Sequence, residues 1–190
     1  MPKQKVTDYF STLSQLMLSI EVTDRQGTAL SLEQGTEKAV QMIVDIKSTS
    51  RKLLLAGNGG SSSIVSHVQN DLCKAVGIRA MVFTEQPLLT ALANDDGYGS
   101  VFEWPIGLWA EPGDLLLTVS SSGRSENIVR ALAAAKKMEC QAITLSGFDE
   151  DNTSRSMGDM NFYVPSHTYS YVESAHTALA HFLTTAAAAC

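Results

Sequence analysis

Residues 114–133 read DLLLTVSSSGRSENIVRALA and join an apolar strand to an amphipathic helix through a serine-rich turn. At such a junction the first N–H groups of the helix have no intrahelical acceptor, and the helix dipole favours negative charge. The four hydroxyls of the turn add donors with little bulk: they belong to Ser120, Ser121, Ser122 and Ser125. The turn therefore predicts a cradle for a phosphate monoester. A serine-rich turn with an N-cap serine and nothing bound is the alternative.

A second polar turn, Gly57–Ser63 (GNGGSSS), follows the strand-like run Lys52–Ala56 and precedes a helix-like run that begins at Ile64. Its glycines let a ligand approach the main chain closely. The spacing does not fit a dinucleotide-binding GxGxxG motif, and the turn lacks the lysine of a P-loop. A phosphorylated small molecule fits this turn better than NAD or ATP.

Short apolar runs alternate with helical patterns from Lys52 onward. The five strand candidates are Lys52–Ala56, Arg79–Phe83, Asp114–Val119, Gln141–Leu145 and Asn161–Val164. This alternation predicts a three-layer αβα sandwich with a five-stranded parallel sheet, of the flavodoxin-like kind. Ligands of such sheets bind beyond the carboxyl ends of the strands, where both polar turns fall.

The first 50 residues have the pattern of two amphipathic helices, from Val6 to about Thr23 and from Leu32 to about Ser48, separated by Asp24–Thr28. We expect residues 1–50 to form a helical extension that builds an oligomer interface, because its apolar faces need cover. Residues 51–190 would form a single ligand-binding domain.

The composition excludes several classes of protein. A net charge of −6 and 14 scattered basic residues argue against a nucleic-acid binder. No apolar run is long enough to span a bilayer, and the N-terminus lacks the apolar stretch of a secretory signal, so we expect a soluble, cytoplasmic protein. Cys73, Cys140 and Cys190 are too far apart for a CxxC pair and are expected to be reduced thiols.

Four residues are candidates for a metal centre. His67 and Asp71 are four positions apart, so both can face one point from a single helix. Glu173 and His181 lie on the predicted final helix. Two imidazoles and two carboxylates suit Zn²⁺ or a similar divalent ion, and a carboxylate beside it can act as a general base. The alternative is a hydrogen bond on a helix surface. His167 and His176 are expected to be surface or packing residues.

These motifs, in this order, resemble the SIS (sugar isomerase) domain family, and within it the phosphoheptose isomerases. The resemblance extends over nearly the whole chain. It rests on the two polar turns, on His67, on the segment Asn94–Tyr98 (NDDGY) and on the final helix with Glu173 and His181.

The resemblance implies a tetrameric enzyme that interconverts sedoheptulose 7-phosphate and the corresponding aldose phosphate by proton transfer through an enediol. It implies that the phosphate is held by Ser120, Ser121, Ser122 and Ser125. It also implies that the sugar is held by Asn58, Gly59, Gly60, Ser61, Asn94, Asp95 and Glu173. The implied metal ligands are His67, Asp71, Glu173 and His181, with one ion per subunit.

Three positions depart from the family pattern. Asp71 stands where the family has a glutamate that serves as ligand and base, Glu173 stands where it has a glutamine, and Ser170 replaces an aspartate. Asp71, His181 and Glu173 are the catalytic candidates, and the residues leave open which carboxylate is the base. A non-catalytic SIS protein that senses a sugar phosphate or binds a protein partner is the alternative function.

Overall fold

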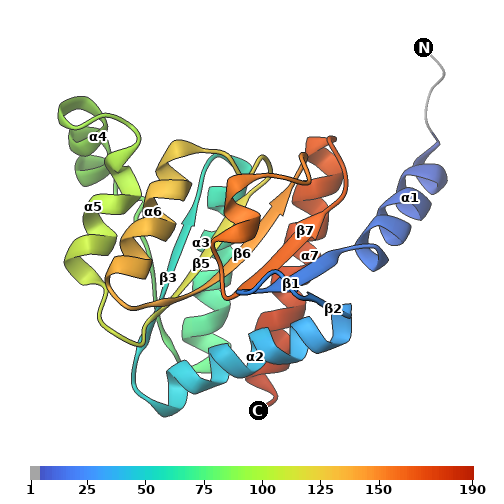
Figure 1. Cartoon of the computed structure of the whole chain (residues 1–190), viewed down its shortest axis with the longest axis horizontal. Coiled ribbons are helices and arrows are strands. Elements are labelled where there is room, and N and C mark those ends of the chain that lie inside the picture. Colours follow the sequence, from blue (N-terminus) through green and yellow to red (C-terminus); the bar gives the residue numbers. More distant parts are fainter. Residues whose placement is uncertain (1–4) are drawn as a thin grey trace.

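The computed structural model describes residues 5–190, and a mixed seven-stranded sheet forms its centre (Figure 1). The strand order is β2-β1-β7-β6-β5-β3-β4, and the five strands from β7 to β4 are parallel to one another. These five are the strands that the sequence predicts. The strands are β1 (Glu21–Asp24), β2 (Ala29–Leu30), β3 (Lys52–Gly57), β4 (Arg79–Val82), β5 (Leu115–Ser120), β6 (Gln141–Gly147) and β7 (Met160–Val164).

Helices cover both faces of the sheet, as predicted (Figure 1). One core lies between the sheet and helices α2, α3 and α7, and the other lies between the sheet and helices α4, α5 and α6. Alternate strand residues feed the two cores: Leu53 and Leu55 belong to the first, Leu54 to the second. The helices are α1 (Val6–Leu18), α2 (Leu32–Ser48), α3 (Gly60–Asp71), α4 (Gln86–Asp95), α5 (Ser100–Trp109), α6 (Glu126–Lys137) and α7 (Tyr169–Ala188).

The prediction of a helix from Val6 to about Thr23 is wrong at its C-terminal end. Helix α1 ends at Leu18, and Glu21–Asp24 forms strand β1, which pairs with β2 and lies antiparallel along β7. Asp24 closes the turn between β1 and β2, because its carboxylate accepts hydrogen bonds from the N–H groups of Gln26 and Thr28. These bonds lower the pKa of Asp24, the bond from Thr28 most. The predicted sheet thus gains a hairpin at one edge.

The two polar turns lie side by side at the carboxyl edge of the sheet. Strands β3 and β5 are neighbours in parallel register, with Gly57 opposite Val119, so the turns that follow them leave the sheet together. Within residues 5–190, no helix combines the length and the hydropathy needed to cross a bilayer. The three cysteines are free thiols, as expected.

Candidate functional site

The serine turn connects β5 to α6 and is shaped by hydrogen bonds within it. The hydroxyl of Ser120 accepts from the N–H of Gly123 at 3.2 Å, and that of Ser122 accepts from the N–H of Arg124 at 3.3 Å. Ser125 occupies the N-cap position of α6, but its side chain makes no capping bond, so its hydroxyl is available to a ligand. The arginine of the turn, Arg124, is exposed and forms ion pairs with Asp149 and Asp151. A bound anion would therefore be met by hydroxyls, amides and the helix dipole.

A short 3₁₀ turn, η2 (Thr153–Ser156), braces the serine turn from behind. Ser154 donates to the carbonyl of Gly123 through both its N–H and its hydroxyl, each at 2.9 Å. Gly123 has φ +59°, and an added Cβ would lie 1.9 Å from Oδ1 of Asn152. Asn152 is itself buried, and its amide donates to Ser146 Oγ and to two carbonyls. Only glycine fits at position 123, so the conformation of the turn is preset by its neighbours.

The hydroxyl of Ser121 is a buried polar atom without a hydrogen-bond partner in the described part of the chain. Nδ1 of His176 is another. The His176 ring is wholly buried, and its Nε2 lies 3.1 Å from the carbonyl of Ser146, which requires that Nε2 carries the proton. Burial lowers the pKa of His176 to about 4, so the imidazole is neutral at physiological pH. His176 is the packing histidine that the sequence predicts.

The glycine turn is tied to the serine turn by a pair of amides. Asn58 and Asn127 exchange hydrogen bonds of 2.9 and 2.8 Å, and the hydroxyl of Tyr98 donates to Asn58 Oδ1. Asn127 lies two residues beyond Ser125, so this pair joins the starts of α3 and α6. Sequence reasoning missed Asn127, Tyr98, Asn152 and Ser154 as parts of the site. Tyr98 and Asn127 lie within the stretches already singled out, and Asn152 and Ser154 carried no such signal.

Asn94 and Asp95 lie at the exposed C-terminal end of α4. The amide of Asn94 donates to Asp95 Oδ1 at 2.6 Å, so the two side chains bond to each other. The link from this segment to the polar turns is made by Tyr98. The assignment of Asn94 and Asp95 to a sugar therefore remains a prediction.

Three of the four predicted metal ligands converge between α3 and α7. Asp71 lies between two histidines, with Oδ1 3.6 Å from Nε2 of His67 and Oδ2 3.4 Å from Nδ1 of His181. The imidazole rings of the two histidines meet edge to face, with centroids 4.8 Å apart. The two histidines are about half exposed, and Asp71 is partly buried at the end of α3, where the chain widens into a π-helical turn, η1 (Leu72–Val76).

This cluster fits a divalent ion. One ligand atom from each residue lies within 4.8 Å of the others. Ligand atoms around a tetrahedral Zn²⁺ are separated by about 3.4 Å, so a small movement of the side chains would bring all three into contact with one ion. Two nitrogens and one oxygen suit zinc, and three protein ligands leave a fourth position open.

Glu173 does not join the cluster within one chain. It is eight residues before His181 on α7, which places it about 12 Å away along the helix axis. Its carboxylate lies against Gly60 at the start of α3, where an added Cβ would be 2.6 Å from Oε1 of Glu173. Helices α3 and α7 run in parallel, so Glu173 pairs with the N-terminal end of α3 and His181 with its C-terminal end. The predicted ligand set of four is thus three residues plus a carboxylate beside the glycine turn.

A surface groove of about 310 Å³ follows the seam between α3 and α7. His67 and His181 line one end, and Ser63 and Thr177, one turn nearer the sheet edge, line the other. Ser63 belongs to the glycine turn and Thr177 lies one helical turn after Glu173, so the groove leads from the histidines toward Glu173 and the polar turns. The remaining histidine, His167, is exposed near Asp149 and lies apart from this groove.

Comparison with known proteins shows the family of this chain. A family model described as SIS domain matches residues 9–147. The chain belongs to the SIS domain family. A phosphoheptose isomerase of Shewanella denitrificans is 32% identical, over 82% of this chain and 83% of that protein. That of Syntrophotalea carbinolica is 33% identical, over 85% and 84%.

The solved structures show the same fold. The structure of a phosphoheptose isomerase from Francisella tularensis superposes with a TM-score of 0.84 and covers 98% of each chain, at 24% sequence identity. The fold class predicted from the sequence, an α/β SIS domain, is confirmed, with the hairpin β1–β2 as an addition to the predicted sheet.

Proposed function

We propose that this SIS domain protein is an aldose–ketose isomerase that acts on a phosphorylated sugar, with sedoheptulose 7-phosphate as the lead substrate. The observation that carries the proposal is the convergence of His67, Asp71 and His181, whose two histidines line one end of a groove that leads to the polar turns. A protein that only senses a sugar phosphate needs the turns but not this cluster. The named relatives, which are phosphoheptose isomerases, support the choice of substrate.

In the proposed complex the serine turn holds the phosphate through Ser120, Ser121, Ser122, Ser125 and the first amides of α6. The unpartnered hydroxyl of Ser121 and the uncapped hydroxyl of Ser125 are suited to this task. Asn58, Gly59, Gly60 and Ser61 would hold the sugar hydroxyls, together with Asn94 and Asp95. Asn58 is held in place for this by its bonds to Asn127 and Tyr98.

Isomerisation moves a proton between C1 and C2 through an enediol, which requires a base at carbon and a group that relocates the hydroxyl proton. We assign the base to Asp71, whose carboxylate lies 3.4 Å from His181 and can reach the same two carbons, whereas Glu173, about 12 Å along α7, would bind sugar hydroxyls beside the glycine turn. Asp71 is held between two imidazoles, which suits a ligand. His181 would move the proton between the two sugar oxygens. A Zn²⁺ bound by His67, Asp71 and His181 would supply charge that stabilises the enediolate.

The test is turnover of sedoheptulose 7-phosphate together with the metal content of the purified protein. We expect isomerisation and one divalent ion per subunit. Asp71→Asn should abolish both turnover and metal uptake, whereas Glu173→Gln should weaken substrate binding and retain the metal. A protein that binds the sugar phosphate but neither takes up metal nor turns it over would be the sensor of the alternative hypothesis.

We also propose that the chain forms a homotetramer in the cytoplasm. Helix α1 buries none of its residues, and the side chains of Val6, Phe10 and Leu18 are each more than 60% exposed. Tyr9 of α1 stacks on Tyr171 of α7 at 4.7 Å and Leu16 and Met17 pack against the core, while the N-terminal end of α1 points away from the body (Figure 1). The exposed apolar side chains of α1 need cover from another subunit, so α1 is the part of the predicted extension 1–50 that we propose as the interface, whereas α2 packs on the sheet. Light scattering tests the homotetramer, and a stable monomer at micromolar concentration would contradict it.

A further inference from the structure

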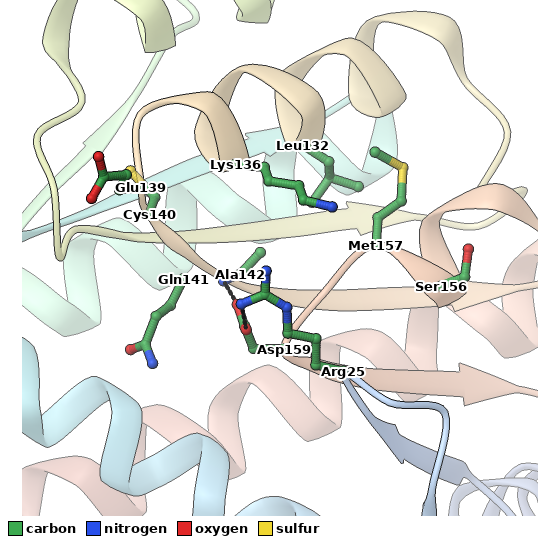
Figure 2. Close-up of a pocket in the computed structure, with 10 residues that line it drawn as sticks. All are labelled: Arg25, Leu132, Lys136, Glu139, Cys140, Gln141, Ala142, Ser156, Met157 and Asp159. Carbon is green, nitrogen blue, oxygen red and sulfur yellow. Dashed lines mark hydrogen bonds and ion pairs between the residues drawn. The ribbon is translucent and has the colours of Figure 1, made fainter.

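A cavity of about 430 Å³ lies at the opposite edge of the sheet from the polar turns (Figure 2). It is formed at the amino ends of β6 and β7, beneath the C-terminal end of α6 and beside the β1–β2 turn. Its volume is within the range of sites that hold small metabolites. The isomerase proposed above makes no use of it, so an inference about it stands independently of that function.

Two cations from distant parts of the chain point into this cavity. Figure 2 shows the ammonium group of Lys136, from α6, and the guanidinium group of Arg25, from the β1–β2 turn, directed toward the same space. Lys136 forms no ion pair or side-chain hydrogen bond with any of residues 5–190. Its charge is therefore available to a ligand.

Of the acidic groups of the cavity, Asp159 offsets the charge of Arg25 and leaves that of Lys136 unpaired. Asp159 already accepts from Arg25 at 3.4 Å and from the N–H of Ala142 at 2.8 Å. The carboxylate of Glu139 points away from both cations (Figure 2). Cys140 adds no negative charge, because burial, assisted by Asp114, raises the pKa of its thiol to about 11. Lys136 is therefore the unpaired charge that faces the cavity.

Part of the remaining wall is apolar. The half-buried side chain of Met157 forms this part, in front of Leu132, which the protein already covers almost completely (Figure 2). An inorganic ion would leave this wall uncovered, whereas a molecule with an anionic head and an apolar body would cover it and gain from its burial. We propose that the cavity binds a small organic anion, with a phosphate or carboxylate between Lys136 and Arg25 and an apolar body against Met157.

The test uses methyl NMR of the full-length protein labelled at methionine, with the Met157 signal assigned from Met157→Leu. The probes are 1-naphthyl phosphate, 2-naphthoate and the neutral 1-naphthol. We expect at least one of the two anions to shift the Met157 signal in a saturable way and the neutral probe to bind about tenfold more weakly. The stronger of the two anions identifies the head group. A Met157 signal that neither anion moves, or that the neutral probe moves equally well, would overturn the proposal.

A matched pair of variants separates the cavity from general charge effects. Lys136 and Lys137 both lie in the last turn of α6, but Lys137 lines a different hollow, between α5 and α6. Lys136→Gln and Arg25→Gln should each weaken the better anion by about tenfold, and Lys137→Gln should leave its affinity unchanged. Equal losses in the two lysine variants would show that the anion is held by the overall field of the helix end and would refute the site. Thermal unfolding of each variant checks that the fold is retained.

Discussion

The serine turn and the His67–Asp71–His181 cluster are built in opposite ways. The turn is buried at its base and held by Asn152 and Ser154 from a separate segment, so its shape exists before a ligand arrives. The cluster stands on the outer surfaces of two helices, with both histidines about half exposed. Its members contact one another over 3.4–3.6 Å, longer than ordinary hydrogen bonds.

This difference shows what fixes the positions of the binding groups in each region. A phosphate is bound by many weak donors that must be placed together, so the fold fixes them in advance. A metal cluster can be drawn together by the ion itself, because the bonds to the metal are strong and directional. Substitutions in the cluster should therefore affect turnover alone. Substitutions in the brace, which is Asn152 and Ser154 behind Gly123, should affect both stability and phosphate binding.

The largest expected effect is on turnover, in His181→Gln. Loss of the proton-relocating imidazole should lower isomerisation of sedoheptulose 7-phosphate by about a thousandfold. Affinity for the sugar phosphate, measured by calorimetry, should be retained because the turn is untouched. His167→Gln is the matched control, since His167 is exposed and lies outside the groove. A large loss of affinity in His181→Gln would break the separation between the two regions.

The brace is tested by Gly123→Ala. The added Cβ would clash with Asn152, and the alanine would have to adopt φ +59°. We therefore expect a loss of about 3 kcal/mol in the free energy of unfolding. Gly27→Ala is the control, because Gly27 has φ +78° with nothing within 4 Å, and it should cost only about 1 kcal/mol. Denaturant unfolding measures both. Equal losses would show that Asn152 yields and that the turn is not tightly held.

His176 joins α7 to the carbonyl of Ser146 and makes the stability depend on pH. Its pKa is about 4 in the folded protein and 6.5 when unfolded, so the unfolded chain binds the extra proton between these values. The stability that His176 provides while its ring is neutral is fully present above pH 6.5. It is lost as the pH falls to about 4, which lowers the free energy of unfolding by about 3 kcal/mol. His176→Gln should flatten this part of the stability curve, whereas His167→Gln should leave it. An unchanged slope in His176→Gln would contradict the assignment.

The smallest effects distinguish the serines of the turn. Ser120→Ala with Ser125→Ala should weaken sugar-phosphate binding by roughly 1–3 kcal/mol and leave the fold intact. Ser125→Ala alone should weaken binding without changing stability, since its hydroxyl makes no cap bond. Ser120→Ala should slightly lower both, because Gly123 loses an acceptor. Calorimetry with sedoheptulose 7-phosphate measures the affinities, and unchanged affinity in the folded double variant would refute the cradle.

Local pattern was sufficient for the parallel sheet and for the position of the serine turn. The five parallel strands and the helices that cover them follow from apolar runs and periodicity, which report the environment of each segment directly. The hairpin was missed because Glu21–Asp24, with one apolar residue among four, is too short to show a strand pattern and reads as the end of the preceding helix. The signal that could have revealed it is Asp24 before Gly27, a pairing that favours a tight turn.

Within the candidate site, the sequence by itself determined which residues share a helix face: His67 with Asp71, four positions apart. Only the tertiary structure decided that His181 meets them and that Glu173 lies beside Gly60, because the register between α3 and α7 is set by packing across more than 100 residues of chain. The same holds for Asn152 behind Gly123 and for Lys136 opposite Arg25. Periodicity predicts which face of a helix or strand is buried, but the residues that pack against that face depend on the tertiary fold of the whole chain.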